Sequence, residues 1–466
     1  MTFPQESSIL FILIHKGTGK RRSGFEGKVG QILRKAYESM QNWERDSVKE
    51  PLMVIGVRQV GKTWLIREFC RQTYHDVFYV NLEEQPMYQS AFEEELSPDA
   101  VLRHLGILSG RRLTENTAIV LDEIQVCERA ITALKYFSEA DGNYRVIAAG
   151  SLLGVKIHRF SSSFPVGKVR LLKLFPMDFE EFLLACGEDL LRDAIRNACV
   201  SLRPLPSAVH EKALNLFFDY CIVGGMPKAV DDYVSRGKNI TAFRREIHQE
   251  LNLAYLADMT KYVASPYETA KIMQVYQSVP RQLAKENPKF KYSAVRENAN
   301  KRDFYAPLDW LKAAGMVLKL NSLETPHAPL KGYENEEIFK LYLSDVGILS
   351  SLCGMMPKDL LTEEANAYKG AVIENCIIQQ FAAQGKETWY YRPSQNMEID
   401  LIYDNGKGVV PAEIKSGRHK RSTSLNQYRE QFHPETSIRF SALNFGRKDD
   451  LCSCPLYAAF GIDLIR

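Results

Sequence analysis

Long apolar runs, a strong charge of one sign and paired cysteines are all missing from this chain of 466 residues. Lys and Arg number 60 against 57 Asp and Glu, so any contact with nucleic acid has to come from local patches. The apolar run at residues 9–14 is far shorter than the ~20 residues of a membrane span, and no basic segment precedes it as in a signal peptide. These absences favour a soluble protein with no membrane partner.

The nine cysteines are scattered, and only Cys452 and Cys454 stand close together. Without a CxxC pair or a Cys/His cluster at zinc spacing, the sequence argues against a structural zinc site. Free thiols in a chain of this length fit a reducing compartment, so we expect a cytoplasmic protein.

Strand-like runs alternate with helical stretches through the first third of the chain, which predicts an α/β fold with a parallel sheet covered on both faces. The predicted strands are residues 52–55, 77–80, 118–121, 145–149 and 169–174. After Pro176 the pattern becomes mostly helical, with a break at Gly224-Gly225-Met226-Pro227.

The first predicted strand is followed by Gly56-Val-Arg-Gln-Val-Gly61-Lys62-Thr63, a full match to GxxxxGK[ST]. The glycines let the loop turn its N–H groups toward phosphates at the start of the next helix. Lys62 is expected on the β- and γ-phosphates and the Thr63 hydroxyl on Mg²⁺. The motif predicts a nucleotide site.

Two acids, Asp122 and Glu123, end the predicted strand 118–121. At the end of a strand beside the phosphate loop, the Asp122 carboxylate can hold Mg²⁺ through water, and Glu123 can orient or deprotonate the attacking water. This pair distinguishes an ATPase from a protein that only binds nucleotide. Ser151 follows a further strand, where it either touches the γ-phosphate or caps the next helix.

A second group of charges lies near the C-terminus, where Asn405-Gly406 predicts a hairpin. A two-residue turn there places Glu413 opposite Glu398, with Asp400 and Lys415 on the same face. Such carboxylates repel unless positive charge sits beside them, and Lys415 and a Mg²⁺ ion are candidates. The alternative is a solvated outer face on an edge hairpin.

The motifs GVRQVGKT, VLDEIQ, AAGSLLGV, FPVGKVRLLKLFPMDFEEFL and GGMPKAV resemble a large family of prokaryotic AAA+-type P-loop ATPases. The family joins the ATPase module to a restriction-endonuclease-like domain of the PD-(D/E)xK type, and the resemblance covers residues 30–466. It implies Walker A at Gly56 to Thr63, Walker B at Asp122 and Glu123, and sensor 1 at Ser151. Pro227 resembles an element that meets the adenine ring, and the alternative, which we prefer, is a helix stop followed by a proline start.

For the tail, the resemblance implies that Glu374, Asp400 and Glu413 hold the metal and that Lys415 positions the attacking water or the phosphate. Gln427, on a later helix, also recurs in that fold. Ile399 replaces the proline of the PD pair. An active metal-dependent nuclease and an inactive scaffold that binds a partner both stay open.

Composition and patterning along the chain, together with this resemblance, give the predicted organisation. It comprises a flexible basic leader (1–24), a P-loop ATPase domain (25–177), a helical lid (178–285), a winged-helix-like module (286–360) and a restriction-endonuclease-like domain (361–466). Lys301, Arg302 and Lys312 form a modest basic face on a module that either packs or reads DNA. Arg159 and Arg170 lie downstream of Ser151, but the sequence does not assign an arginine finger to either of them.

The sequence therefore predicts an ATPase that binds ATP and Mg²⁺ and is coupled to a nuclease-like tail acting on nucleic acid. The alternative is an ATP-dependent regulatory scaffold whose tail binds a protein and cuts nothing. Nucleic acid and a second copy of the chain are left open as partners.

Overall fold

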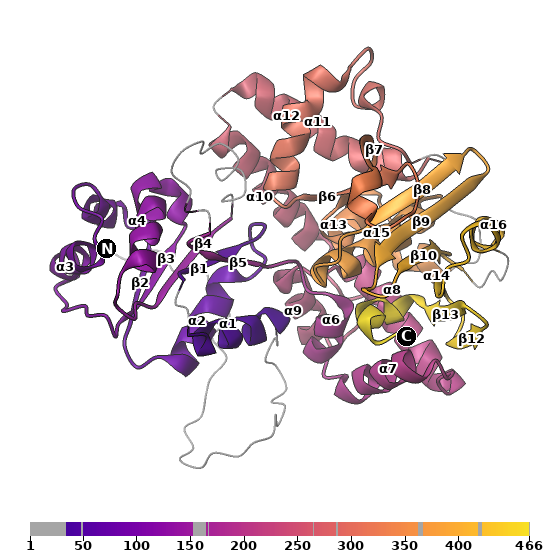
Figure 1. The fold of residues 1–466 in the computed structure, drawn as a ribbon, viewed down its shortest axis with the longest axis horizontal. Coiled ribbons are helices and arrows are strands. Elements are labelled where there is room, and N and C mark those ends of the chain that lie inside the picture. Colours follow the sequence, from indigo (N-terminus) through magenta and orange to yellow (C-terminus); the bar gives the residue numbers. More distant parts are fainter. Residues whose placement is uncertain are drawn as a thin grey trace.

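The computed structural model describes residues 34–47, 50–151, 165, 167–263, 265–285, 288–361, 367–417 and 422–465. A five-stranded and an eight-stranded sheet lie toward opposite ends of the molecule, with helices between them (Figure 1). The predicted leader at 1–24 lies outside the described residues. Within the described ranges, no helix combines the length and the apolar character that crossing a bilayer requires.

The first sheet is parallel throughout and has the strand order β2-β3-β4-β1-β5. Its strands are β1 (Leu52–Ile55), β2 (Val77–Asn81), β3 (Ala118–Asp122), β4 (Val146–Gly150) and β5 (Arg170–Lys173). The predicted α/β class and all five strands are confirmed. Because the strands are parallel, β1, β3 and β4 all end at one edge, where their carboxyl-terminal residues face a common site.

Helices cover both faces of this sheet, as the alternation predicted. They are α1 (Lys35–Arg45), α2 (Lys62–Thr73), α3 (Pro98–Ser109) and α4 (Glu128–Glu139), with the 3-10 helices η1 (Pro86–Phe92) and η2 (Ile124–Val126). Leu52 and Val54 pack in the core shared with α1 and α2, whereas Met53 packs in the core formed with α3 and α4. This alternation along β1 is what a strand buried on both faces requires.

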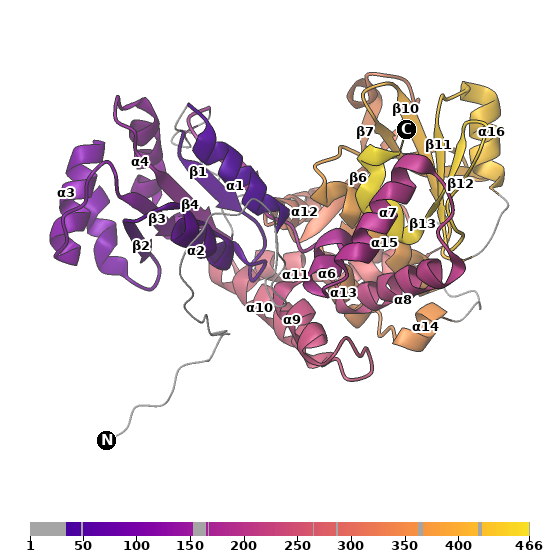
Figure 2. The same cartoon turned by 90° about the horizontal axis from the view of Figure 1, so that it is seen from below.

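The middle of the chain is helical. Its elements are α6 (Phe179–Ala185), α7 (Asp189–Ser201), α8 (Ser207–Val223), α9 (Pro227–Ser235), α10 (Glu246–Tyr262), α11 (Pro266–Leu283) and α12 (Lys301–Ala313), with η3 (Tyr292–Ala294). The predicted break separates α8 from α9. There a Cβ on Gly225 would lie 2.0 Å from the Met177 carbonyl oxygen, so only glycine fits. In both views α9 and α10 lie between the parallel sheet and the tail (Figures 1 and 2).

The second sheet has the strand order β12-β13-β11-β10-β9-β8-β6-β7. Its strands are β6 (Val317–Leu323), β7 (Glu334–Leu343), β8 (Trp389–Ser394), β9 (Met397–Asp404), β10 (Val409–Ile414), β11 (Ser437–Ser441), β12 (Gly446–Lys448) and β13 (Leu451–Pro455). The helices around it are α13 (Val346–Leu352), α14 (Pro357–Leu361), α15 (Ala367–Ala383) and α16 (Thr423–Phe432), with η4 (Leu330–Tyr333) and η5 (Leu456–Leu464).

This sheet crosses the boundary predicted at residue 360. The strand expected to belong to a separate module, β6, pairs in parallel with β8 of the tail, with Ser322 beside Tyr390. Residues 317–343 are therefore built into the tail's sheet, and the tail shares one continuous sheet with the segment before it.

The hairpin between β9 and β10 is present, but its predicted register is wrong. The loop has four residues, 405–408, and Val410 pairs with Tyr403. The Asn405 side chain accepts hydrogen bonds from the Lys407 and Gly408 amides at 2.9 and 3.0 Å, which favours this wider turn. The pairing moves by two residues, so the faces are kept. Continuing the register places Glu413 beside Asp400 instead of Glu398.

Candidate functional site

The predicted phosphate loop connects β1 to α2, which starts at Lys62. A Cβ on Gly56 would lie 2.3 Å from the Leu174 carbonyl oxygen, so the loop can pass β5 only with glycine there. Gly61 has φ +96°, a left-handed conformation that favours glycine at the helix N-cap. The loop thus ends at the positive end of α2, which is suited to bind an anion.

Lys62 is buried inside this loop. Its Nζ donates to the Gly56 and Val57 carbonyl oxygens at 2.9 and 3.0 Å. Burial lowers the pKa of Lys62 to about 8, against the raising effect of the Glu123 and Asp122 charges. An anion bound beside the ammonium would favour its charged form, so this loop is suited to a phosphate group.

Asp122, the last residue of β3, connects this strand to α2 and to β2. Its Oδ2 accepts from Thr63 Oγ1 at 2.8 Å and from the Tyr79 hydroxyl at 2.6 Å. A hydroxyl and a buried carboxylate at this separation are the hard oxygen donors that Mg²⁺ takes beside phosphates. Thr63 and Asp122 therefore fit the ion they were predicted to hold. Tyr79 was missed, because its side chain reaches Asp122 from the neighbouring strand.

Glu123 has φ 50°, which is uncommon for a residue other than glycine. Its amide donates to Asp122 Oδ1 at 3.0 Å, and its carboxylate accepts from the Gln125 amide. These contacts fix Glu123 in orientation beside the phosphate loop. Gln125 was not singled out in the sequence, although it lies only two positions after Glu123.

Ser151 is buried at the end of β4, and both of its predicted roles remain predictions. The helix that it was expected to cap lies outside the described residues, as does Arg159. Arg170 pairs with Leu52 at the start of β5 and forms an ion pair with Asp46 at 2.8 Å. Arg170 therefore lies at the amino-terminal end of the parallel strands, whereas the phosphate loop lies at their carboxyl-terminal end.

Pro227 is the first residue of α9, as expected of a proline start after a helix stop. It also faces the phosphate loop, because a Cβ on Gly61 would lie 3.4 Å from Pro227 Cγ. The two explanations weighed for this proline are thus compatible, and a contact with adenine stays a prediction.

Two arginines tie the phosphate loop to other parts of the chain, and neither was identified from the sequence. Arg34 donates to the Val60 carbonyl at 2.9 Å and pairs with Glu181 at 3.1 Å. Arg58, inside the loop, forms an ion pair with Asp258 of α10. Partners so distant in sequence have no local signal.

In the tail, the corrected register brings together the residues of the predicted second site. Lys415 Nζ lies 2.6 Å from Glu413 Oε1, and the Ile414 amide donates to Asp400 Oδ2 at 2.7 Å. Burial and the nearby Glu374 charge raise the pKa of Asp400 to about 7, although Lys340 opposes this.

Lys340 of β7 is the residue that sequence reasoning missed here. Its side chain is 1% exposed, and its Nζ lies 2.7 Å from Glu374 and 2.6 Å from Glu398. Tyr342 also donates to Glu374, at 2.6 Å, and Arg392 pairs with Glu398 at 2.8 Å. Lys340 and Arg392 therefore supply positive charge beside these carboxylates, in addition to the predicted Lys415.

The predicted metal set of Glu374, Asp400 and Glu413 fits an ion only in part. In the described part of the chain, no three His, Cys, Asp or Glu side chains are grouped so that they could hold a metal. Glu374 is engaged by Lys340 and Tyr342, whereas Glu413 Oε2 is buried without a hydrogen-bond partner. Gln427 is exposed on α16.

The basic residues of α12 are exposed, and Lys301 pairs with Glu337 at 2.9 Å. The opposite face of α12 packs Phe304, Leu308 and Leu311 into the main core. This arrangement accommodates both predicted roles of the segment.

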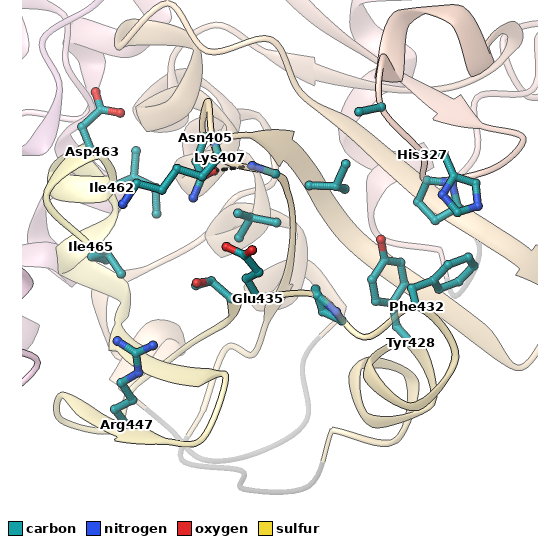
Figure 3. Close-up of a pocket in the computed structure, with 17 residues that line it drawn as sticks. His327, Asn405, Lys407, Tyr428, Phe432, Glu435, Arg447, Ile462, Asp463 and Ile465 are labelled. Atoms are coloured by element: carbon teal, nitrogen blue, oxygen red, sulfur yellow. Dashed lines mark hydrogen bonds between the residues drawn. The ribbon is translucent and has the colours of Figure 1, made fainter.

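A cavity of about 810 Å³ opens at the turn end of the β9–β10 hairpin. The rings of His327, Tyr428 and Phe432 line one side, and Arg447 and Asp463 lie on the other (Figure 3). No predicted site residue lines this cavity, so it is separate from the phosphate loop and from the carboxylate cluster.

Comparison with family models divides the chain into three segments. Residues 48–183 match an AAA domain, residues 214–359 match a domain of unknown function (DUF8612), and residues 369–457 match another (DUF4143). The AAA match contains the phosphate loop, Asp122 at the end of β3 and Glu123, which follows it. No curated protein matched the chain.

Among solved structures, a Walker-type ATPase of Pyrococcus abyssi is 16% identical, with a TM-score of 0.42, covering 71% of this chain and 99% of its own. The ORC2 protein of Aeropyrum pernix, in ADPNP-ADP complexes, is 13% identical, with a TM-score of 0.38, covering 74% of this chain and 96% of its own. Cdc6p of Pyrobaculum aerophilum is 12% identical, with a TM-score of 0.28, covering 75% of this chain and 97% of its own.

Proposed function

Starting from an AAA-type ATPase domain at residues 48–183, we propose that this chain binds Mg²⁺ and ATP at the phosphate loop and hydrolyses the terminal phosphate. The observation that carries the proposal is the 2.8 Å hydrogen bond from Thr63 to Asp122, beside the buried ammonium of Lys62. It brings a hydroxyl, a carboxylate and a cation to one sheet edge, which is the set that a metal-bound triphosphate needs.

Each residue has a separate role in this proposal. Lys62 exchanges its hydrogen bonds to the loop carbonyls for bonds to the β- and γ-phosphates. Thr63 and Asp122 hold Mg²⁺, which neutralises charge on the phosphates when bound. Glu123, held by Gln125, accepts the proton of the water that attacks the γ-phosphorus, and the ADP oxygen leaves on the opposite side.

The test separates binding from turnover. Glu123→Gln keeps the shape of the side chain but removes the base, so we expect nucleotide affinity within about twofold of the parent and turnover lower by roughly 10²–10⁴-fold. Arg71→Gln, in an exposed ion pair on the same helix as Lys62, serves as the control and should change neither. Equal loss of affinity and turnover in Glu123→Gln would contradict the role of Glu123 as base.

For the tail, we propose the second of the two predicted functions, binding of a partner without cutting. Lys340 supports this role because it occupies Glu374 and Glu398 with a buried ion pair, which leaves fewer carboxylates for an ion. In this role the tail binds a protein. Nucleic acid and a second copy of the chain also stay open as partners of the whole chain.

A nuclease assay of the full chain decides between the two functions of the tail. Incubation with DNA and RNA in Mg²⁺ is expected to give no cleavage above that of Glu413→Ala. Cleavage that is abolished by Glu413→Ala, retained in the exposed control Glu387→Ala and accompanied by unchanged ATP affinity would overturn the non-cutting role.

A further inference from the structure

Arg58 lies in the middle of the phosphate loop and reaches out of its domain. Its guanidinium, 42% exposed, pairs through Nη1 with Asp258, whose side chain is 1% exposed on α10. Among the described residues, Asp258 is the one hydrogen-bond acceptor of Arg58, and Asp258 Oδ2 is buried without a partner. An arginine carries five N–H donors in a planar fork, so most of this donor set finds no acceptor within the described part of the chain.

The end of α10 meets the ATPase domain at a further point. Lys261 forms an ion pair with Glu83, which follows β2. Burial raises the pKa of the next residue, Tyr262, and the side chain of Gln125, the residue that holds Glu123, acts against this increase. One turn of α10 therefore forms ion pairs with the phosphate loop and with Glu83 after β2.

The charge of Arg58 acts on the residues that are expected beside a terminal phosphate. Arg58 and Asp258 both act on the pKa of Lys62, the first lowering it and the second raising it, although burial is the largest influence. Glu123 also raises the pKa of Arg58, against the lowering effect of burial. The charge of Arg58 is thus coupled to those of the phosphate-binding lysine and the proposed base.

We propose that Arg58 contacts the terminal phosphate of the bound triphosphate while keeping its ion pair with Asp258, so that this pair links the phosphate to α10. The inference rests on the proposed function and adds a sensor of the nucleotide state to the same site. Arg58 is the binding residue, and Asp258 is a positioning residue that acts through it.

Two physical features favour a bridge over a simple exchange of partners. If Arg58 left Asp258, a buried carboxylate would remain without its counter-ion, which is strongly unfavourable. A guanidinium can instead bind two anions on different edges of its fork, which an ammonium on a flexible stem does not do with fixed geometry. A diphosphate lacks the oxygens that Arg58 would contact, so the bridge distinguishes ATP from ADP.

Calorimetry on the full chain tests the binding part, with Mg²⁺ and either ADP or the non-hydrolysable triphosphate AMP-PNP. In Arg58→Gln, we expect affinity for AMP-PNP to fall roughly tenfold or more, since charge-assisted bonds are lost, while affinity for ADP stays within about twofold. The control Arg71→Gln should bind both nucleotides like the parent.

Hydrogen exchange of residues 255–262 tests the link to α10. The parent is expected to differ in exchange there between AMP-PNP and ADP. Asp258→Asn should abolish that difference while AMP-PNP affinity changes by less than about threefold, because Arg58 remains. The control Glu250→Gln, in an exposed pair on the same helix, should keep the difference. A purely structural role of Asp258 would raise exchange equally with both nucleotides.

The outcomes separate the two proposals. Equal effects of Arg58→Gln on ADP and AMP-PNP, or an α10 difference that persists in Asp258→Asn, would overturn the sensor and leave nucleotide binding intact. If the parent chain binds neither nucleotide, the proposed function and the sensor fail together.

Discussion

Replacing Asp400 by asparagine should stabilise the tail at neutral and alkaline pH, although it removes a residue of the predicted second site. Burial and the Glu374 charge raise the pKa of Asp400 from its ordinary 3.8 to about 7. The folded chain therefore holds this proton more tightly than the unfolded chain, and stability falls as pH rises from about 4 to about 7. The corresponding cost above pH 7 is about 3 to 5 kcal/mol.

Asparagine avoids this cost and retains an oxygen that accepts from the Ile414 amide, as Asp400 does at 2.7 Å. We therefore expect Asp400→Asn to exceed the parent in unfolding free energy by up to about 4 kcal/mol at pH 8, with the advantage fading toward pH 4. Urea titration with hydrogen exchange of β9 and β10 peptides measures this for the tail alone.

Asp404→Asn, exposed on the same strand, is the matched control and should show no such pH-dependent gain. An Asp400→Asn variant that is no more stable than the parent at pH 8, or whose gain does not depend on pH, would refute the account of this cluster.

Three further substitutions probe both sites. Gly56→Ala puts a methyl group 2.3 Å from the Leu174 carbonyl, so the loop must shift, and calorimetry should detect no nucleotide binding; normal affinity would contradict the tight passage of the loop past β5. Tyr79→Phe removes the 2.6 Å hydrogen bond to Asp122. It should raise the Mg²⁺ concentration for half-maximal ATPase activity by roughly tenfold. An unchanged Mg²⁺ titration would show that Tyr79 does not position Asp122. Lys340→Met leaves Glu374 and Glu398 without their buried counter-ion. In urea titrations it should destabilise the tail by about 3–5 kcal/mol at pH 8 and by less at pH 4. An equal loss of stability at the two pH values would contradict the charge balance assigned to Lys340.

The parallel sheet and the phosphate loop could be predicted because their signals are local. Each strand is a short apolar run, and the loop combines fixed glycines with Lys62 and Thr63 over eight consecutive residues. The edge that gathers Thr63, Asp122 and Glu123 then follows from the parallel order of the strands, since all of them end on one side.

The remaining features depend on long-range pairing, which no local pattern records. Lys340 meets Glu374 and Glu398 only because β6 and β7 join the tail's sheet. Arg58 and Asp258 are 200 positions apart. The predicted hairpin register was wrong for a different reason. An Asn-Gly pair alone favours a two-residue turn, but the Asn405 side chain accepts hydrogen bonds from the Lys407 and Gly408 amides and so favours a four-residue loop.

Binding of Mg²⁺ and ATP by the purified, folded full chain tests the central claim most directly. Titration calorimetry should give one saturable site in the parent chain and no measurable heat of binding in Lys62→Ala, whose folding is checked by circular dichroism. A parent chain without affinity for any magnesium nucleotide, or a Lys62→Ala chain that binds as the parent does, would contradict the assignment of the site to the loop between β1 and α2.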